Sequence, residues 1–181
     1  WRSFWPGALA KAAGVTAVYE RSDVEVRTPE GLTPRTGPAL GDPAGTVAMR
    51  EAGIAYEVDI ARGQKTGFFL DQRDNRALAA TLAKDASVLN LFCYTGGFTL
   101  AALAAGATET LSVDTSEEAL EAGRRGVAAN GFDSSRARWV NADVFGQLHR
   151  LLLDILGATG QIDWSRAAVD SLSVRAVQGG I

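Results

Sequence analysis

Two residue types that build metal sites and disulfides are almost missing from this sequence. Its 181 residues include one cysteine and one histidine, which excludes an internal disulfide and a metal centre built from Cys and His ligands. A single cysteine is typical of a reducing compartment, so we expect a cytoplasmic protein. No apolar run is long enough to span a bilayer, and residues 1–14 lack the pattern of a signal peptide, so no membrane partner is expected.

The sequence also lacks an excess of positive charge, with 18 Lys and Arg residues against 21 Asp and Glu residues. The formal net charge is −3 and the isoelectric point is about 5.2. Proteins that bind nucleic acid through bulk electrostatics are basic, so such a role would need a local basic patch or a further domain. Hydrophobic residues make up 46% and charged residues 22%, which is ordinary for a globular domain. Because position 1 is Trp1 rather than methionine, we expect the sequence to begin inside a longer protein.

The first sixty residues predict a helix and several short strands. The expected elements are a helix remnant over 1–14, strands at 16–20 and 24–28, a turn at 29–32, a loop over 33–46, and a hairpin of 47–51 and 54–60. The hairpin has the strongest pattern, because apolar Ile54, Tyr56 and Val58 alternate with polar or small residues, the period of a half-buried strand. Ala52-Gly53 supplies its turn.

From residue 61 the sequence alternates between strands and helices. The expected elements are a short strand at 68–70, a helix capped by Asp71 and running to about residue 84, a strand at 88–92, a helix to Ala105, a strand at 110–114, a helix over 115–130 with the capping box Thr115 and Glu118, and a strand over 137–143. Leu78 and Leu82 are expected on the buried side of the first helix. This alternation predicts a parallel sheet with right-handed crossovers. An amphipathic helix is expected from residue 144.

The stretch VLNLFCYTGGFTL, residues 88–100, indicates a strand, a tight glycine turn and the start of a helix. Backbone N–H groups at such a turn favour polar or negative groups of a nucleotide-like cofactor. The dinucleotide-binding pattern has a third glycine where this chain has Leu100, and that glycine lets helix and strand close around a pyrophosphate. The turn at 94–97 therefore disfavours a nicotinamide cofactor and leaves room for S-adenosylmethionine, which has no phosphates.

Two aspartates follow the next strands of the predicted sheet. Asp114 ends the second parallel strand and Asp143 ends the third. Because the carboxyl ends of parallel strands meet at one edge, these side chains and the glycine turn are expected to share one crevice. There, Asp114 would accept hydrogen bonds from ribose hydroxyls, and Asp143 from an adenine amino group. The alternative for each is a helix N-cap, a role in which Thr115 competes with Asp114.

Other reactive side chains have two interpretations. Lys65, Arg73 and Arg76 lie close together just before the glycine-turn strand. They either form a cap over the cofactor, with Arg73 or Gln72 binding its carboxylate, or belong to a solvated loop and helix end. Cys93 is interpreted as a small packed residue rather than a nucleophile, because no base lies near it in the sequence.

Several long segments resemble one family of RNA-modifying enzymes. GQKTGFFLDQRDNR (63–76), VLNLFCYTGGFTLAALAAGA (88–107), SVDTSEEAL (112–120) and VYERSDVEVRTPEGL (18–32) resemble the class I S-adenosylmethionine-dependent large-subunit rRNA cytosine-5 methyltransferases. The resemblance covers residues 1–143. It implies an α/β, Rossmann-like class I methyltransferase sheet, truncated here and preceded by a small β-hairpin region. It also implies S-adenosyl-L-methionine as cofactor and ribosomal RNA as partner, although the family's RNA-binding PUA domain is missing from this sequence.

Carried over by position, the resemblance implies nine cofactor-binding residues and no metal ligand. They are Phe68, Gln72 and Arg73 in the pocket wall, Asn90, Phe92, Tyr94 and Gly96 on the methionine and turn side, Asp114 at the ribose and Asp143 at the adenine. The family also has an Asp-Pro-Pro motif after a fourth strand and a later nucleophilic cysteine, which attacks the pyrimidine ring so that its C5 atom can take the methyl group. Because this sequence has neither, no catalytic residue is assigned and an inactive, cofactor-binding fragment is expected.

The last residues resemble a different family. LHRLLLDILGATGQIDWSRAAVDSLSVRAVQGG (148–180) is similar to DDE-type insertion-sequence transposases, in which Asp170 would be the first of three metal-binding carboxylates. The expected domains are the helix remnant and hairpin region at 1–60, an incomplete methyltransferase core at 61–143, and a foreign tail at 144–181. Two alternatives stay open, namely an active RNA methyltransferase in which Asp170 replaces the fourth motif, and a transposase fragment with no activity.

Overall fold

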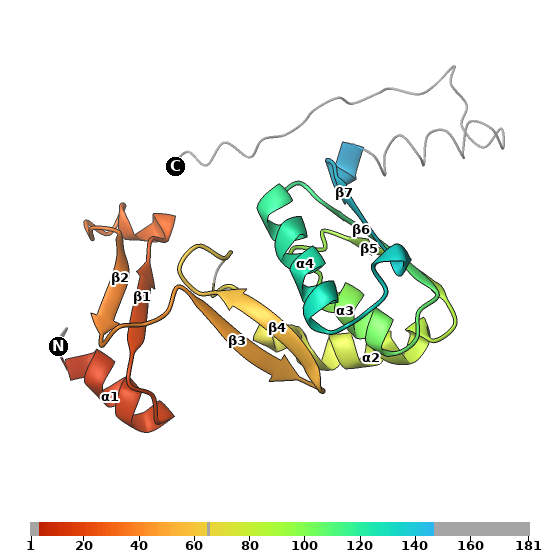
Figure 1. The fold of residues 1–181 in the computed structure, drawn as a ribbon. Helices are drawn as coiled ribbons and strands as arrows, with labels where there is room; N and C mark the ends of the chain where they lie inside the picture. The colour runs from red at the N-terminus through yellow and green to blue at the C-terminus, as the bar shows by residue number, and fades with distance from the viewer. Residues whose placement is uncertain (1–3, 65, 147–181) are drawn as a thin grey trace, which may run out of the picture. The chain divides into compact units, whose positions relative to one another are not determined.

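The computed structural model describes residues 4–64 and 66–146 (Figure 1). It consists of two compact units, residues 1–142 and 143–181. The elements of the first unit are α1 (Phe4–Ala13), β1 (Val18–Ser22), the 3₁₀ helix η1 (Glu25–Arg27), β2 (Arg35–Leu40), β3 (Thr46–Glu51), β4 (Ile54–Asp59), η2 (Leu70–Gln72), α2 (Arg73–Ala83), β5 (Ser87–Leu91), α3 (Gly97–Ala104), β6 (Glu109–Asp114), α4 (Glu117–Ala129), η3 (Ser134–Arg136) and β7 (Ala137–Asn141). Among the described residues, no helix has the length and apolar content to cross a membrane.

Strands β5, β6 and β7 form a parallel sheet in that order. Helices α3 and α4 connect these strands, as the predicted alternation requires. The two helices pack directly on each other, because a Cβ added to Gly126 of α4 would lie 2.8 Å from a methyl carbon of Leu100 of α3. The predicted α/β, Rossmann-like sheet is therefore confirmed for residues 87–141. Its register places Asp114 beside Asn141 at the carboxyl edge.

The main apolar core joins the β3–β4 hairpin to helices α3 and α4. Its buried members are Ile54, Tyr56, Val58, Phe68, Leu100, Ala101, Leu103 and Val127. The alternation along β4 that the sequence predicts is confirmed, since every second side chain of that strand is buried. Asn130, at the end of α4, also holds the hairpin, because its amide accepts a hydrogen bond from the N–H of Ala55 and donates one to the Ala55 carbonyl, both at 2.8 Å.

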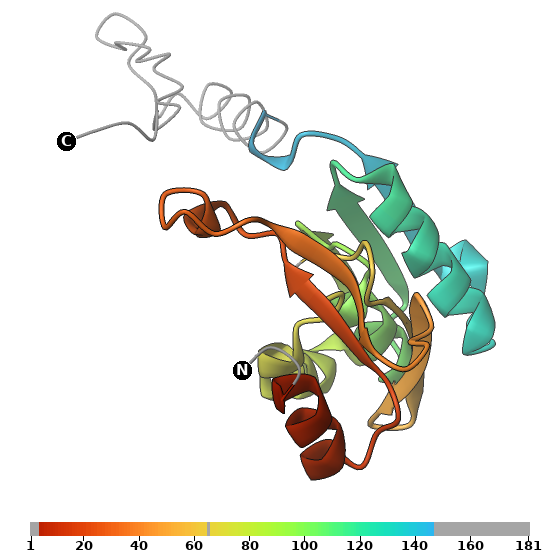
Figure 2. The same ribbon diagram turned by 90° about the vertical axis from the view of Figure 1, so that its left-hand side faces the viewer.

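The N-terminal strands lie at different residues from those that the sequence predicts. Strand β1 lies antiparallel to β2, and α1 packs against both (Figure 2). Residues 24–28, predicted as a strand, contain the 3₁₀ helix η1, whereas part of the loop predicted over 33–46 forms strand β2. Val24 and Val26 are both exposed. A strand is stabilised by packing on a pleated face, and the exposed side chains of Val24 and Val26 have no such packing.

Helix α2 does not bury the leucines that its periodicity predicts. Leu78 and Leu82 are 63% and 75% exposed. The helix instead contacts α3 and closes a small alanine cluster with Ala83 and Ala102. Alanine side chains let two helices approach closely, so the contact face is the one that carries small residues. The predicted helix is confirmed, and its predicted buried side is wrong.

The side chain that α2 does bury is charged. Arg76 forms two hydrogen bonds to the carboxylate of Glu51 in β3, at 2.7 and 2.8 Å. Its side chain is 4% exposed and that of Glu51 is 13% exposed. The guanidinium also donates to the Phe69 carbonyl at 2.9 Å and lies 4.4 Å from the centre of the Phe68 ring. This buried pair fixes α2 and the segment before it to the hairpin.

Three predictions at element ends are also corrected. The strand predicted at 68–70 is absent, because Phe68 lies in the core and the 3₁₀ helix η2 follows. Asp71 does not cap α2, whose N-cap is Gln72 without a side-chain bond. Ser116, not Thr115, caps α4 by accepting a hydrogen bond from an N–H of the first turn at 3.2 Å. A shift of one residue decides which hydroxyl reaches that turn.

Replacing Arg76 with methionine is expected to lower the free energy of unfolding by about 3 kcal/mol, because Glu51 would keep a buried charge without a partner. Urea unfolding of the full chain measures the change. The control is Arg124→Met, which removes a pair that is exposed on α4 and should cost less than about 1 kcal/mol. Equal losses in the two variants would contradict the role given to the buried pair.

Candidate functional site

The turn between β5 and α3 has a backbone conformation that most residues avoid. Phe92 and Tyr94 have positive φ angles of 56° and 49°, and Gly96 has a φ of 75°. A side chain at Gly96 would overlap the ring of Trp139, which reaches it from β7. Non-glycine residues with positive φ carry a conformational cost and collect at binding sites. Contacts from the surrounding structure must therefore hold this turn in place.

Asp114, at the end of β6, supplies the most direct of these contacts. One carboxylate oxygen accepts a hydrogen bond from the Tyr94 N–H at 2.8 Å, and the other accepts one from the Ser116 N–H at 3.0 Å. Its backbone carbonyl accepts a third from Ala142, just after β7, at 3.0 Å. One residue thus joins the glycine turn, the start of α4 and the end of the third strand.

A polar network lies beneath the turn. The Asn90 amide of β5 donates to the Thr99 hydroxyl of α3 at 2.8 Å, and that hydroxyl is 2.6 Å from the Ser112 hydroxyl of β6. Thr99 and Ser112 are fully buried. Buried polar groups that satisfy one another favour a single packing arrangement. The predicted site residue Asn90 therefore supports the turn from below.

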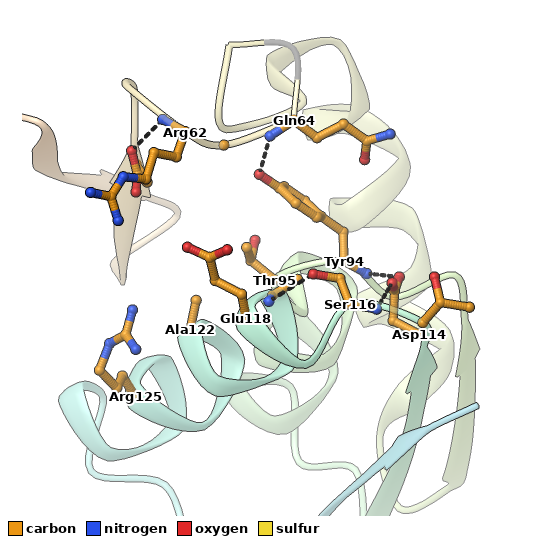
Figure 3. A pocket seen from close by; sticks show the side chains of 13 residues that line it. Arg62, Gln64, Tyr94, Thr95, Asp114, Ser116, Glu118, Ala122 and Arg125 are labelled. Carbon is orange, nitrogen blue, oxygen red and sulfur yellow. Dashed lines mark hydrogen bonds between the residues drawn. The ribbon is translucent and has the colours of Figure 1, made fainter. Parts of the chain in front are cut away.

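A cavity of about 390 Å³ opens beside the turn (Figure 3). Two of the nine predicted site residues, Tyr94 and Asp114, line it. The other lining residues come from the end of β4 and the loop after it, the glycine turn, the residues just before α4, and α4 itself: Asp59, Arg62, Gly63, Gln64, Thr95, Thr115, Ser116, Glu118, Ala119, Ala122 and Arg125. The carboxyl edge of the sheet thus carries a cavity whose wall combines a carboxylate, hydroxyls and charged side chains.

The loop after β4 forms the wall opposite α4. The Tyr94 hydroxyl accepts a hydrogen bond from the Gln64 N–H at 2.8 Å, which connects the loop to the glycine turn. From β1, Arg21 donates to the carbonyls of Gly63 at 2.9 Å and Ile60 at 3.3 Å. Sequence reasoning did not single out this wall, because the loop is held by contacts with residues far away in the sequence, and such contacts leave no periodic pattern.

Four further predicted residues lie outside this cavity, on the segment before β5 or within the turn. Phe68 is buried in the core. Gln72 accepts a hydrogen bond from Asn75 within α2, and Arg73 pairs with Asp74 at 2.9 Å on the wall of a separate cavity. Phe92 is exposed in the turn.

Of the last two predicted residues, one lies in the turn and the other after β7. Gly96, at the start of α3, lies against Trp139. Asp143 belongs to the second unit, where its carboxylate accepts a hydrogen bond from the Phe145 N–H at 3.1 Å. Lys65, His149 and Asp170 lie outside the described residues.

Burial changes the acidity of two side chains in the turn. Burial raises the pKa of Tyr94, and the hydrogen bond that its hydroxyl accepts from the Gln64 N–H offsets part of this rise. Burial, together with the negative charge of Asp114, raises the pKa of the Cys93 thiol to about 12. Cys93 is 6% exposed, and a protonated thiol is a poor nucleophile. The geometry agrees with the interpretation of Cys93 as a packing residue.

Comparison with known families and curated proteins gives a consistent result. Residues 36–159 match a family described as S-adenosylmethionine-dependent methyltransferase. A ribosomal RNA large subunit methyltransferase I from Alteromonas mediterranea is 52% identical over 141 residues, which are 78% of this chain and 36% of that protein. Its namesake from Tolumonas auensis is 49% identical over 140 residues, or 76% of this chain and 35% of that protein. The chain spans about a third of the length of these relatives.

Solved structures show the same fold. A protein from Streptococcus mutans described as a SAM-dependent methyltransferase has a TM-score of 0.68 and 28% identity, over 82% of this chain and 38% of that one. A methyltransferase structure with the same TM-score and coverage is complexed with SAH. A SAM-dependent methyltransferase from Agrobacterium tumefaciens, 22% identical with a TM-score of 0.61 over 77% of this chain and 43% of that one, shares the fold.

The family match also bears on the predicted boundary in the chain. It continues to residue 159, past the junction expected near residues 143–144. The structure describes the chain up to residue 146. The predicted transposase-like segment therefore lies almost wholly outside the described residues, and its residues 160–181 lie beyond the family match.

Cys93 provides a test of the turn as described. Because its thiol pKa is raised to about 12, the thiol stays protonated at about pH 8, and iodoacetamide should label it at least roughly 100-fold more slowly than the chain denatured in guanidinium chloride. As the chain has one cysteine, mass spectrometry measures the modification without ambiguity. Labelling of the native chain at the denatured rate would contradict a buried Cys93.

Proposed function

We propose, from the premise that the chain belongs to the family of S-adenosylmethionine-dependent methyltransferases, that the cavity beside the glycine turn holds this cofactor. The observation that carries the proposal is the placement of Asp114. A carboxylate at the end of the second parallel strand lines the cavity together with Tyr94 and Thr95 of the turn. This is the place where open α/β sheets bind nucleoside-containing ligands.

The residues of the cavity suit the nucleoside part of the cofactor. Each Asp114 oxygen accepts one backbone N–H, and a carboxylate oxygen can accept a second hydrogen bond. Both oxygens can therefore also accept a ribose hydroxyl while the backbone bonds hold the side chain still. When bound, the cofactor supplies a methyl group on a positively charged sulfur.

The proposed substrate is a cytosine of large-subunit ribosomal RNA, methylated at C5 by the longer protein of which these residues would be a part. The support is the likeness to two proteins named ribosomal RNA large subunit methyltransferase I. The 181 residues contain no Asp-Pro-Pro sequence, and their one cysteine is Cys93, which is buried. We therefore propose that these residues alone bind the cofactor without transferring its methyl group.

Asp114→Asn should weaken binding of S-adenosylhomocysteine at least about tenfold, because it removes the charge that strengthens hydrogen bonds from the ribose. Isothermal titration calorimetry of the full chain measures the affinity. Asp133→Asn is the matched control, since Asp133 also accepts the N–H two residues on, in a turn away from the cavity. The proposal fails if the chain does not bind, or if Asp114→Asn and Asp133→Asn bind equally well.

Methyl transfer is tested separately. With tritiated S-adenosylmethionine and a large-subunit rRNA transcript, the 181-residue chain is expected to incorporate no label above a heat-denatured sample, because its one cysteine is buried and cannot attack a pyrimidine ring. Scintillation counting of the recovered RNA gives the answer. Incorporation above that background would favour the alternative in which Asp170 takes part in an active site.

A further inference from the structure

The cavity has a second polar region, away from Asp114. Figure 3 shows Arg62 on the loop after β4 and Glu118 on the first turn of α4. Within residues 4–64 and 66–146, neither side chain has a hydrogen bond or an ion pair; the one bond recorded at Arg62 is made by its backbone N–H. A cation and an anion that line the same cavity, and that are not paired with each other, can both serve a ligand.

Two other arginines considered for the cofactor site are already paired with carboxylates. Arg125 lines the same cavity, but it pairs with Glu57 at 2.9 Å. Arg73 pairs with Asp74 and lines a different cavity. Of the two arginines that line this cavity, Arg62 is therefore the one whose guanidinium is not paired with a carboxylate of the described residues and can bind a ligand.

The loop that carries Arg62 is fixed before any ligand arrives. One carboxylate oxygen of Asp59 accepts the N–H groups of Ala61 at 2.9 Å and Arg62 at 2.7 Å. The next residue, Gly63, has its carbonyl held by Arg21 at 2.9 Å. Glu118 stands on the regular helix α4. The backbone that carries both side chains is therefore held in place, and binding a ligand would cost only the freedom of the side chains themselves.

We infer that Arg62 and Glu118 recognise the amino-acid end of the cofactor, an inference that rests on the proposed function of the cavity. S-adenosylmethionine has a nucleoside at one end and an α-carboxylate with an α-ammonium at the other. If Asp114 holds the ribose, the amino-acid end needs one cation and one anion. The Arg62 guanidinium binds the carboxylate, for which its planar donors are well matched, and Glu118 accepts from the ammonium. The sequence had suggested Gln72 or Arg73 for the carboxylate.

Two ligands separate this inference from the proposed function. S-adenosylhomocysteine has the amino-acid end, whereas methylthioadenosine has the same nucleoside thioether without it. The affinities of both are measured by calorimetry for the full wild-type chain, Arg62→Gln and Glu118→Gln. The control is Arg124→Gln, on the same helix as Glu118 but outside the lining of the cavity. Thermal unfolding of each variant checks that it folds.

Arg62→Gln and Glu118→Gln are each expected to weaken S-adenosylhomocysteine about tenfold, as expected for losing one charge-assisted hydrogen bond at a partly exposed site. Their affinity for methylthioadenosine should stay within about twofold of wild type, and Arg124→Gln should leave both affinities in that range. Unchanged binding of S-adenosylhomocysteine, or an equal loss for both ligands, would overturn the inference while the proposed function stands. Failure of the wild-type chain to bind either ligand would overturn both.

Discussion

The carboxylate of Asp114 is the contact on which the geometry of the site depends. It receives the N–H of Tyr94 from the glycine turn and that of Ser116 from the start of α4. Tyr94 is in a left-handed conformation that few non-glycine residues adopt, so the turn needs such a partner. From the other side, Trp139 fills the space that side chains at Gly96 and Gly123 would occupy. The loops at the carboxyl edge therefore form one unit, and the charge that positions them faces the cavity.

The N-terminal region completes the site. Arg76 and Glu51 bind α2 to the β3–β4 hairpin through a buried ion pair, and the hairpin packs its apolar face on α3 and α4. The loop that leaves the hairpin then meets Tyr94 through Gln64. The cavity wall opposite α4 thus belongs to a segment that precedes the sheet in the sequence. Its cationic Arg62 adds a charge that the sheet edge does not supply.

The sequence predicted the elements whose apolar residues recur with a regular period over many positions. The parallel strands, the helices between them and the position of Asp114 followed from periodicity and from the rule that ligands meet the carboxyl ends of strands. Features set by distant contacts were missed. Leu78 and Leu82 are exposed because α2 meets α3 through small residues. Residues 35–40 were predicted as part of a loop, but they form strand β2 because they pair with β1. The role of Glu118 in the cavity was missed because the sequence placed this residue in a capping box. Arg62 was missed because it lies on a loop that has no periodic pattern of apolar residues.

The central claim is that the cavity beside the glycine turn binds the nucleoside of the cofactor. Amide NMR spectra of the isotopically labelled chain, recorded as S-adenosylhomocysteine is added, test it most directly. The account predicts that the largest shifts fall on the N–H groups of Tyr94, Thr95 and Ser116, which surround Asp114 in the cavity. Largest shifts at Ala77 and Ala101, in the separate cavity beside α2, would contradict it.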